Sequence, residues 1–199
     1  MQVAVIDSGG ANVGSVLQAL KRSSIEGQLT QSKAIIESAD RVILPGVGTA
    51  HAAMATLREH KLIDTIRGLT QPVLGICLGL QLLFESSSEG EQHTECLGVI
   101  PGLVDRLPSS PTLRLPHMGW NQLKWTADDP LARYLNDQDW FYFVHSYAVA
   151  FDQPATIATA DHGISFAAVV RHKNFWATQF HPEKSAGAGQ RLLQGFLDL

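Results

Sequence analysis

The chain has 199 residues, of which 45% are hydrophobic and 17% charged, and its formal net charge is −4 with a pI near 6.0. This composition excludes an intrinsically disordered chain, and the scattered Lys and Arg residues provide no basic surface for nucleic acid. Because there are only two cysteines, no basic N-terminal region and no apolar run near the ~20 residues of a membrane span, we expect one cytoplasmic domain, residues 1–199.

In the first half of the chain, short β-branched runs alternate with amphipathic stretches. The runs cover residues 3–7, 41–44 and 72–76, and the stretches cover 13–21, 50–67 and 78–85. This alternation predicts a parallel sheet covered by helices. Glycine-containing turns follow the runs at residues 8–10, 45–48 and 75–79. We expect these turns to meet at the C-terminal edge of one sheet, where open α/β sheets bind ligands.

The second half has the pattern of strands separated by Gly, Pro, Asn and Asp turns. The expected strands are 99–107, 113–125, 140–150, 156–160 and 166–179. We expect mostly antiparallel pairing here, followed by a final helix at 188–197, where Leu192, Leu193 and Phe196 recur on one face. The predicted fold class is therefore α/β, with a central, mostly parallel sheet flanked by helices and an antiparallel sheet in the second half.

The segment Gly75-Ile76-Cys77-Leu78-Gly79 has the form of a nucleophile elbow, G-x-C-x-G. In such an elbow a strand turns sharply into a helix, and flanking glycines let the two backbones approach each other. The helix amides and dipole then point at the Cys77 sulfur and favour the thiolate, and the Leu78 amide becomes a candidate oxyanion donor. By itself the pattern is equally compatible with a small buried cysteine, which is our interpretation of Cys96.

A candidate base follows an apolar run near the C-terminus. His181 and Glu183 are two residues apart, so in extended backbone they project to one side, and Glu183 can orient the His181 ring. The alternative is a solvated loop with an incidental carboxylate. The eight histidines show no spacing typical of metal ligands, so we predict no metal site.

Another glycine-flanked turn, Pro45-Gly46-Val47-Gly48, follows an expected strand. Its backbone amides can turn towards a neighbouring site at low steric cost, so Val47 or Gly48 is a candidate second oxyanion donor. A purely structural turn between strand and helix is the alternative. Its expected position at the sheet edge beside Cys77 favours the oxyanion role.

Together, GICLGLQ at residues 75–81 and FHPE at 180–183 resemble the class I glutamine amidotransferase family. The resemblance extends over nearly the whole chain. It implies a Cys77, His181 and Glu183 triad that releases ammonia from glutamine through a glutamyl thioester, with no cofactor. The motifs at 45–48, 81–85, 115–121, 143–147 and 181–185 point to one member of this family, and LPHMGWN at 115–121 is the most telling.

The resemblance also implies binding residues and a partner. The glutamine would be held by Gly46, Gln81, Glu89, His145, Ser146 and Tyr147, together with the Gly48 backbone. The partner would be a (β/α)8-barrel cyclase subunit that receives the ammonia, in a heterodimer. Its interface is expected near Asn12, Met118, Trp120, Tyr142 and Lys184, although Met118 and Trp120 are equally compatible with a core position.

One loop departs from the family pattern. The family reads D-Y-G-x-G-N, whereas residues 7–12 here read Asp-Ser-Gly-Gly-Ala-Asn, without the aromatic residue and the last glycine. Coupling to the partner or affinity for glutamine is expected to differ accordingly. Two other readings stay open: a glutaminase subunit of a different synthase, which the 115–121 motif disfavours, and a catalytically silent regulatory subunit.

Overall fold

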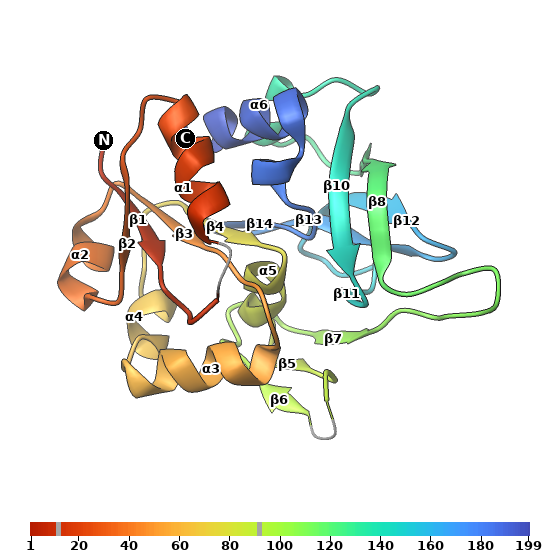
Figure 1. Ribbon diagram of the computed structural model, residues 1–199, viewed down its shortest axis with the longest axis horizontal. Helices are drawn as coiled ribbons and strands as arrows, with labels where there is room; N and C mark the ends of the chain where they lie inside the picture. Colours follow the sequence, from red (N-terminus) through yellow and green to blue (C-terminus); the bar gives the residue numbers. More distant parts are fainter. Residues whose placement is uncertain (11–12, 91–92) are drawn as a thin grey trace.

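The computed structural model describes residues 1–10, 13–90 and 93–199. Its centre is an eight-stranded sheet in the order β2-β1-β3-β4-β14-β13-β12-β9 (Figure 1). The parallel part contains β1 (Val3–Ile6), β2 (Gly27–Thr30), β3 (Arg41–Leu44), β4 (Val73–Ile76) and β14 (Phe175–Thr178). The antiparallel part adds β13 (Ser165–His172), β12 (Thr156–Asp161) and β9 (Lys124–Trp125).

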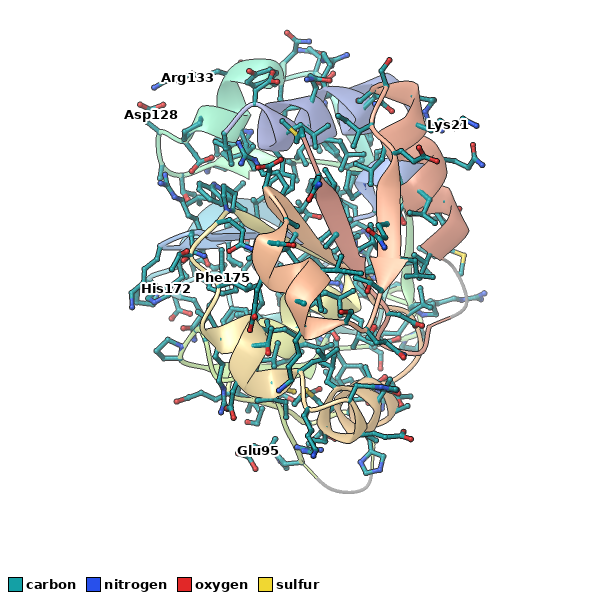
Figure 2. The ribbon with its side chains drawn as sticks, turned by 90° about the vertical axis from the view of Figure 1, so that its left-hand side faces the viewer. Lys21, Glu95, Asp128, Arg133, His172 and Phe175 are labelled. Atoms are coloured by element: carbon teal, nitrogen blue, oxygen red, sulfur yellow. The ribbon has the colours of Figure 1, made fainter. Side chains whose placement is uncertain are left out.

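Alternation along the strands divides the core into two layers. In β1, Val3 and Val5 pack into one hydrophobic cluster, whereas Ala4 and Ile6 pack into the other. The first cluster lies under α1 (Val13–Arg22) and α6 (Ala186–Leu197). The second lies under α2 (Lys33–Ser38), α3 (Ala50–Glu59), α4 (Ile63–Arg67) and α5 (Leu78–Leu83). The sheet is thus a middle layer between two helical layers, as Figures 1 and 2 show.

Two smaller sheets contain strands of the second half of the chain, and one of them also includes the strands at residues 86–87 and 94–95. One pairs β8 (His117–Gln122) with β10 (Trp140–His145), and the other has the order β11 (Tyr147–Val149), β7 (Leu103–Arg106), β5 (Ser86–Ser87) and β6 (Thr94–Glu95). Short 3-10 helices are η1 (Pro130–Tyr134) and η2 (Pro182–Lys184). Pairing in this half is mostly antiparallel, which confirms the expectation; β14 with β4 and β5 with β7 are the parallel pairs that involve it.

Several predicted elements are divided or were missed. Residues 50–67 form two helices because Lys61 takes a left-handed conformation with φ 54°, and residues 166–179 form a hairpin that turns at Lys173 with φ 55°. Residues 140–150 form two strands that belong to different sheets, and strand 113–125 begins only at His117. The sequence did not predict β2 and α2. The strand β2 was missed because it is a partly exposed edge strand without a hydrophobic run.

The glycine-containing turns meet at one sheet edge, as predicted. Residues 8–10, 45–48 and 77 follow β1, β3 and β4, which are neighbouring parallel strands. Two glycines let the backbones touch there: a Cβ on Gly79 would overlap the Leu44 carbonyl oxygen, and a Cβ on Gly46 would lie 2.6 Å from the Leu78 Cβ. The start of α5 is therefore packed directly against the end of β3. Within the described residues, no helix is both long and apolar enough to cross a membrane.

Candidate active site

A cavity of about 250 Å³ opens at this sheet edge. It is lined by Gly46, Val47, Gly48, Cys77, Leu78, Gln81, Glu89, Val144, His145, Ser146, Tyr147, His181 and Lys184. The cavity thus brings together two predicted catalytic side chains, every predicted oxyanion residue and every predicted glutamine-binding residue. This volume is slightly below the ~300–1,000 Å³ range typical of ligand pockets, which suits a molecule of amino-acid size.

Cys77 occupies the turn between β4 and α5 in a conformation that side chains rarely adopt. Its φ is 53° and its ψ is −107°. The Cys77 amide donates to the Thr178 carbonyl at 2.7 Å, and the Cys77 carbonyl accepts from the amides of Leu80 and Gln81. The backbone is therefore tied to β14 on one side and to α5 on the other. These bonds hold a strained turn that presents the thiol to the cavity.

His181 and Glu183 form a buried pair beside the thiol. His181 Nδ1 lies 2.7 Å from Glu183 Oε1, and the two side chains are only 4% and 3% exposed. Because a carboxylate can only accept, Nδ1 carries the hydrogen, which leaves Nε2 for the thiol. Burial lowers the pKa of His181, but contacts with Cys77 and Glu183 outweigh burial and raise that pKa to about 10. An imidazolium is the expected form at neutral pH.

The local backbone differs from the extended conformation that the sequence predicted. Glu183 lies in the 3-10 turn η2, and His181 is its N-cap residue. Glu183 therefore reaches the ring from a tight turn rather than from a straight strand. The turn is fixed to β10, because the His181 amide donates to the Tyr142 carbonyl at 2.9 Å and the Ser185 hydroxyl accepts from the Tyr142 amide at 2.9 Å.

The predicted oxyanion residues lie close together. Gly46 approaches the first residues of α5, where its hypothetical Cβ would be 2.7 Å from the Gly79 amide nitrogen. Gly48 has a φ of 95°, which favours glycine. The 45–48 turn and the start of α5 consequently form one continuous wall of the cavity. Backbone amides from both segments can serve an oxyanion at this place.

Two further polar side chains, Gln81 and Glu89, line the cavity. Glu89 accepts a hydrogen bond from the Ala50 amide at 2.7 Å, at the first residue of α3. Gln81, which is 5% exposed, donates to the Tyr147 carbonyl at 3.0 Å. A carboxylate and an amide at this position can bind the charged end of an amino acid.

His145 belongs to a hydrogen-bonded chain of neutral rings. Its Nδ1 donates to the Tyr147 carbonyl at 2.9 Å, so its Nε2 accepts from His117 Nδ1 at 3.0 Å. Burial lowers the pKa of His145 to about 3, against the opposing effect of the Tyr147 bond. Burial, and to a lesser extent His162, lowers the pKa of His117 to about 4. Both rings are uncharged at neutral pH.

Of the predicted interface residues, Met118 and Trp120 are exposed on β8, Tyr142 on β10 is half-buried, and Lys184 is exposed in η2. Met118 is 63% exposed and Trp120 is 49% exposed, so neither belongs to the core. The Trp120 ring contacts Tyr142 at a centroid distance of 6.0 Å, and Lys184 lines the cavity. Asn12 lies outside the described residues.

Three residues in or beside the cavity were not predicted from the sequence. Gln179 Nε2 donates to the Cys77 sulfur at 3.7 Å, the Val144 carbonyl lies 4.0 Å from that sulfur, and His117 supports His145. A signal for Gln179 was available: it precedes His181 by two residues at the end of a strand, so both side chains project to one side. Val144 and His117 lie within the 143–147 and 115–121 motifs, but those motifs assigned neither of them a role in the cavity. Among the described residues, no group of three or more His, Cys, Asp or Glu is placed to hold a metal ion.

Comparisons with known proteins agree with this geometry. The family model described as glutamine amidotransferase class-I matches residues 4–199. The chain belongs to the class-I glutamine amidotransferase family. It is 49% identical over 199 residues to "Imidazole glycerol phosphate synthase subunit HisH" of Idiomarina loihiensis, a match that covers 100% of this chain and 98% of that protein. The HisH subunit of Mannheimia succiniciproducens is 47% identical, with 98% of each chain covered.

Solved structures share the fold. A structure described as a glutamine amidotransferase has a TM-score of 0.74 at 23% identity and covers 98% of this chain and 97% of that chain. The structure of PurLQS from Thermotoga maritima has a TM-score of 0.73 at 17% identity, with 99% and 97% covered. At these identities the likeness concerns the fold, and it confirms the predicted fold class.

Proposed function

We propose that this chain is the glutaminase subunit of an imidazole glycerol phosphate synthase in histidine biosynthesis. It hydrolyses glutamine to glutamate and ammonia, and it delivers the ammonia to a cyclase subunit. The observation that carries the chemistry is the strained Cys77 elbow with the buried His181–Glu183 pair in one cavity. The pathway is supported by the HisH relatives, which match over the full length of the chain.

In the proposed cycle, the Cys77 thiolate attacks the carboxamide carbon of glutamine. The Leu78 amide and an amide of Val47 or Gly48 stabilise the oxyanion that forms on the carboxamide oxygen. His181 donates its proton to the departing nitrogen, the C–N bond breaks, and ammonia leaves a glutamyl thioester. His181 then takes a proton from water, and the resulting hydroxide attacks the thioester. The C–S bond breaks, which releases glutamate and restores the thiolate.

Glutamine recognition would use the remaining polar groups that line the cavity. Glu89 would pair with the α-ammonium group, and Gln81 would contribute its amide oxygen. Gly46 and residues 145–147 would form the remaining contacts through backbone groups, with His145 holding the segment in place. The cavity of about 250 Å³ supports a small, polar substrate of this kind.

The partner would be a (β/α)8-barrel cyclase subunit that binds at the exposed face of β8 and β10. This face presents Met118 and Trp120, an aromatic and flexible apolar pair typical of interfaces, next to Tyr142 and close to Lys184. Asn12 completes the proposed set. The Tyr142 carbonyl accepts the His181 amide, so the proposed interface is one hydrogen bond from the triad. We further propose a single domain, residues 1–199, that works in the cytoplasm.

The deciding experiment is ammonia release from glutamine by the purified chain, alone and with the cyclase subunit and its nucleotide ligand. Cys77→Ser provides the blank. We expect a Cys77-dependent rate that rises when partner and ligand are both present, because a glycine-flanked oxyanion turn can change orientation and loss of one donor costs ~10²- to 10³-fold in rate. Equal rates with and without the partner would leave the glutaminase chemistry standing and overturn the synthase assignment.

The rival of a silent regulatory subunit needs its own measurement. A glutamine analogue with an electrophilic side chain would label Cys77 covalently in an active glutaminase, and Cys77→Ala would remove the label. Absence of labelling, together with absence of Cys77-dependent ammonia release, would make the silent subunit the better reading.

A further inference from the structure

A buried amide that the proposed cycle does not use lies against the nucleophile. Gln179 is 0% exposed and follows β14 directly. Its Nε2 donates to the Cys77 sulfur at 3.7 Å, and its Oε1 accepts from Gln81 Nε2 at 3.1 Å. One side chain thus bridges the candidate nucleophile and a candidate glutamine-binding residue.

The orientation of the Gln81 and Gln179 side-chain amides follows from their contact with the Tyr147 backbone carbonyl, which Gln81 makes directly. The Tyr147 oxygen can only accept, and it takes hydrogen bonds from His145 Nδ1 at 2.9 Å and Gln81 Nε2 at 3.0 Å. Gln81 therefore directs its nitrogen to this carbonyl and to Gln179. Because the second Gln81 hydrogen is donated to Gln179, the oxygen of Gln179 faces Gln81 and its nitrogen faces the sulfur.

The hydrogen bonds of Gln81 also determine which of its atoms remains available to a ligand in the cavity. An amide nitrogen has two hydrogens, and both Gln81 hydrogens are used, by Tyr147 and by Gln179. The group that remains for a ligand is Gln81 Oε1, an acceptor. An acceptor suits an N–H group of the ligand, such as an ammonium, and disfavours its carboxylate.

We propose that Gln179 is a positioning residue that acts on two partners: it keeps an N–H donor on the Cys77 sulfur, and it holds Gln81 with its oxygen towards the substrate. The role in glutamine binding rests on the proposed function. The role at the sulfur concerns the thiol alone. An N–H donor stabilises the thiolate more than the thiol or the thioester. The donor therefore favours the attacking nucleophile and also the sulfur that leaves when the thioester is hydrolysed.

The first test is the pH profile of Cys77 alkylation by iodoacetamide in the isolated chain, with modified peptides identified by mass spectrometry. Cys96 provides little background, because burial raises its thiol pKa to about 11. The near-isosteric Gln179→Met variant removes the donor, and we expect the alkylation midpoint to rise by about one pH unit, the size typical of a hydrogen bond to a charged group. Thr159→Val is the matched control, since it removes another buried polar group from the same sheet and should leave the midpoint unchanged.

A second variant keeps the test decisive if Gln179→Met does not fold. Gln179→Glu can still accept from Gln81 but presents no N–H to the sulfur, so its midpoint should rise at least as far as that of Gln179→Met. Wild-type profiles in the folded variants would overturn the proposal and reduce Gln179 to a satisfied core amide. This result does not depend on glutamine turnover, so it stands apart from the fate of the proposed function.

Steady-state kinetics in the complex with the cyclase separate the two roles. Gln179→Met should lower kcat and raise KM for glutamine, because both partners lose their orientation. Gln179→Glu should lower kcat and leave KM within about twofold, because Gln81 stays held. If both variants change KM alone, the contact with the sulfur has no role in the reaction and that half of the proposal falls.

Discussion

His181 and His145 are both buried in the same cavity, but at neutral pH one ring is cationic and the other is uncharged. His181 has its pKa raised to about 10, whereas His145 has its pKa lowered to about 3. The difference lies in their partners. His181 contacts the Glu183 carboxylate and the Cys77 sulfur, while His145 contacts the Tyr147 carbonyl and the neutral His117 ring.

The comparison teaches that burial alone does not decide the charge of a histidine. Desolvation lowers the pKa of both rings, and only a negatively charged acceptor reverses this effect. A cationic ring beside Cys77 favours a thiolate and can protonate ammonia. A neutral His145 ring supports the 145–147 segment and adds no positive charge that would compete with the substrate's ammonium group for Glu89, its proposed partner.

Removal of the acceptor from His181 should have the largest effect. Glu183→Gln keeps the shape of the side chain but removes its charge, so the pKa of His181 should fall and its tautomer should no longer be fixed. By analogy with triads that lose their carboxylate, ammonia release should decrease by about 10²- to 10⁴-fold. An NMR titration of His181 would report the pKa directly.

The control for this variant is Asp128→Asn. Asp128 is an exposed carboxylate whose side chain is 84% accessible and which pairs with Arg133 at the molecular surface (Figure 2). Its loss should leave ammonia release unchanged. Wild-type activity in Glu183→Gln would show that His181 does not need its orienting carboxylate.

The opposite pKa shifts predict opposite effects of pH on stability. His117 and His145 have lowered pKa values, so they stabilise the fold above pH 6.5, and this contribution is lost as the pH falls towards 4 and 3. His181 has a raised pKa, so its contribution is present below pH 6.5 and is lost as the pH rises towards 10.

Denaturant unfolding between pH 4 and pH 10 would measure both effects. With the other groups equal, the free energy of unfolding should decrease on both sides of about pH 6.5. Glu183→Gln should flatten the alkaline side and leave the acid side as in the wild type. A variant that flattened only the acid side would contradict the assignment of the raised pKa to His181.

Loss of the hydrogen bond between the uncharged His117 and His145 rings should lower the stability of the fold. His117→Leu leaves the Nε2 of His145 buried without its donor, and an unsatisfied buried polar group costs about 1–3 kcal/mol. Urea unfolding at pH 7 would measure this loss, with the exposed His51→Leu as a control that should change little. An equal loss in both variants would argue against a specific role of the His117–His145 bond.

The smallest effect on the isolated chain is expected at the exposed aromatic face. Trp120 is 49% exposed and lies outside both histidine sites, so Trp120→Ala should change stability by only about 0.5 kcal/mol. Binding to the cyclase subunit, measured by calorimetry, should weaken clearly in the same variant. Unchanged binding would move the proposed interface away from β8 and β10.

The parts of the fold that the sequence predicted are those with strong local patterns. The strands at Arg41–Leu44 and Val73–Ile76 are buried and β-branched, and their glycine-flanked turns specify a sharp change of direction. The strand β2 was missed because an edge strand needs no hydrophobic run. The breaks at Lys61 and Lys173 were missed because neither residue is a typical turn former with positive φ.

The same distinction applies to the cavity. Cys77, His181 and Glu183 were predicted because they stand in short motifs, although Glu183 lies in a 3-10 turn and not in the expected extended backbone, and their catalytic roles stay predictions until activity is measured. Gln179 and His117 depend on partners that are 102 and 28 residues away in the chain. Such contacts arise from the packing of separate strands. The spacing of Gln179 to His181 and the 115–121 motif mark these residues, but they do not specify the distant partners.

The hydrogen bond between Glu89 and the Ala50 amide links the proposed substrate-binding carboxylate to the start of α3. Ala50 is two residues after Gly48, so the carboxylate proposed to receive the substrate's positive charge also holds the segment that follows the turn with the proposed oxyanion donors. Only Glu89 Oε2 accepts from the Ala50 amide, so Oε1 keeps its acceptor capacity for a cation such as the substrate's ammonium group. Glu89 would then connect the amino end of the substrate to the segment that carries the proposed oxyanion donors.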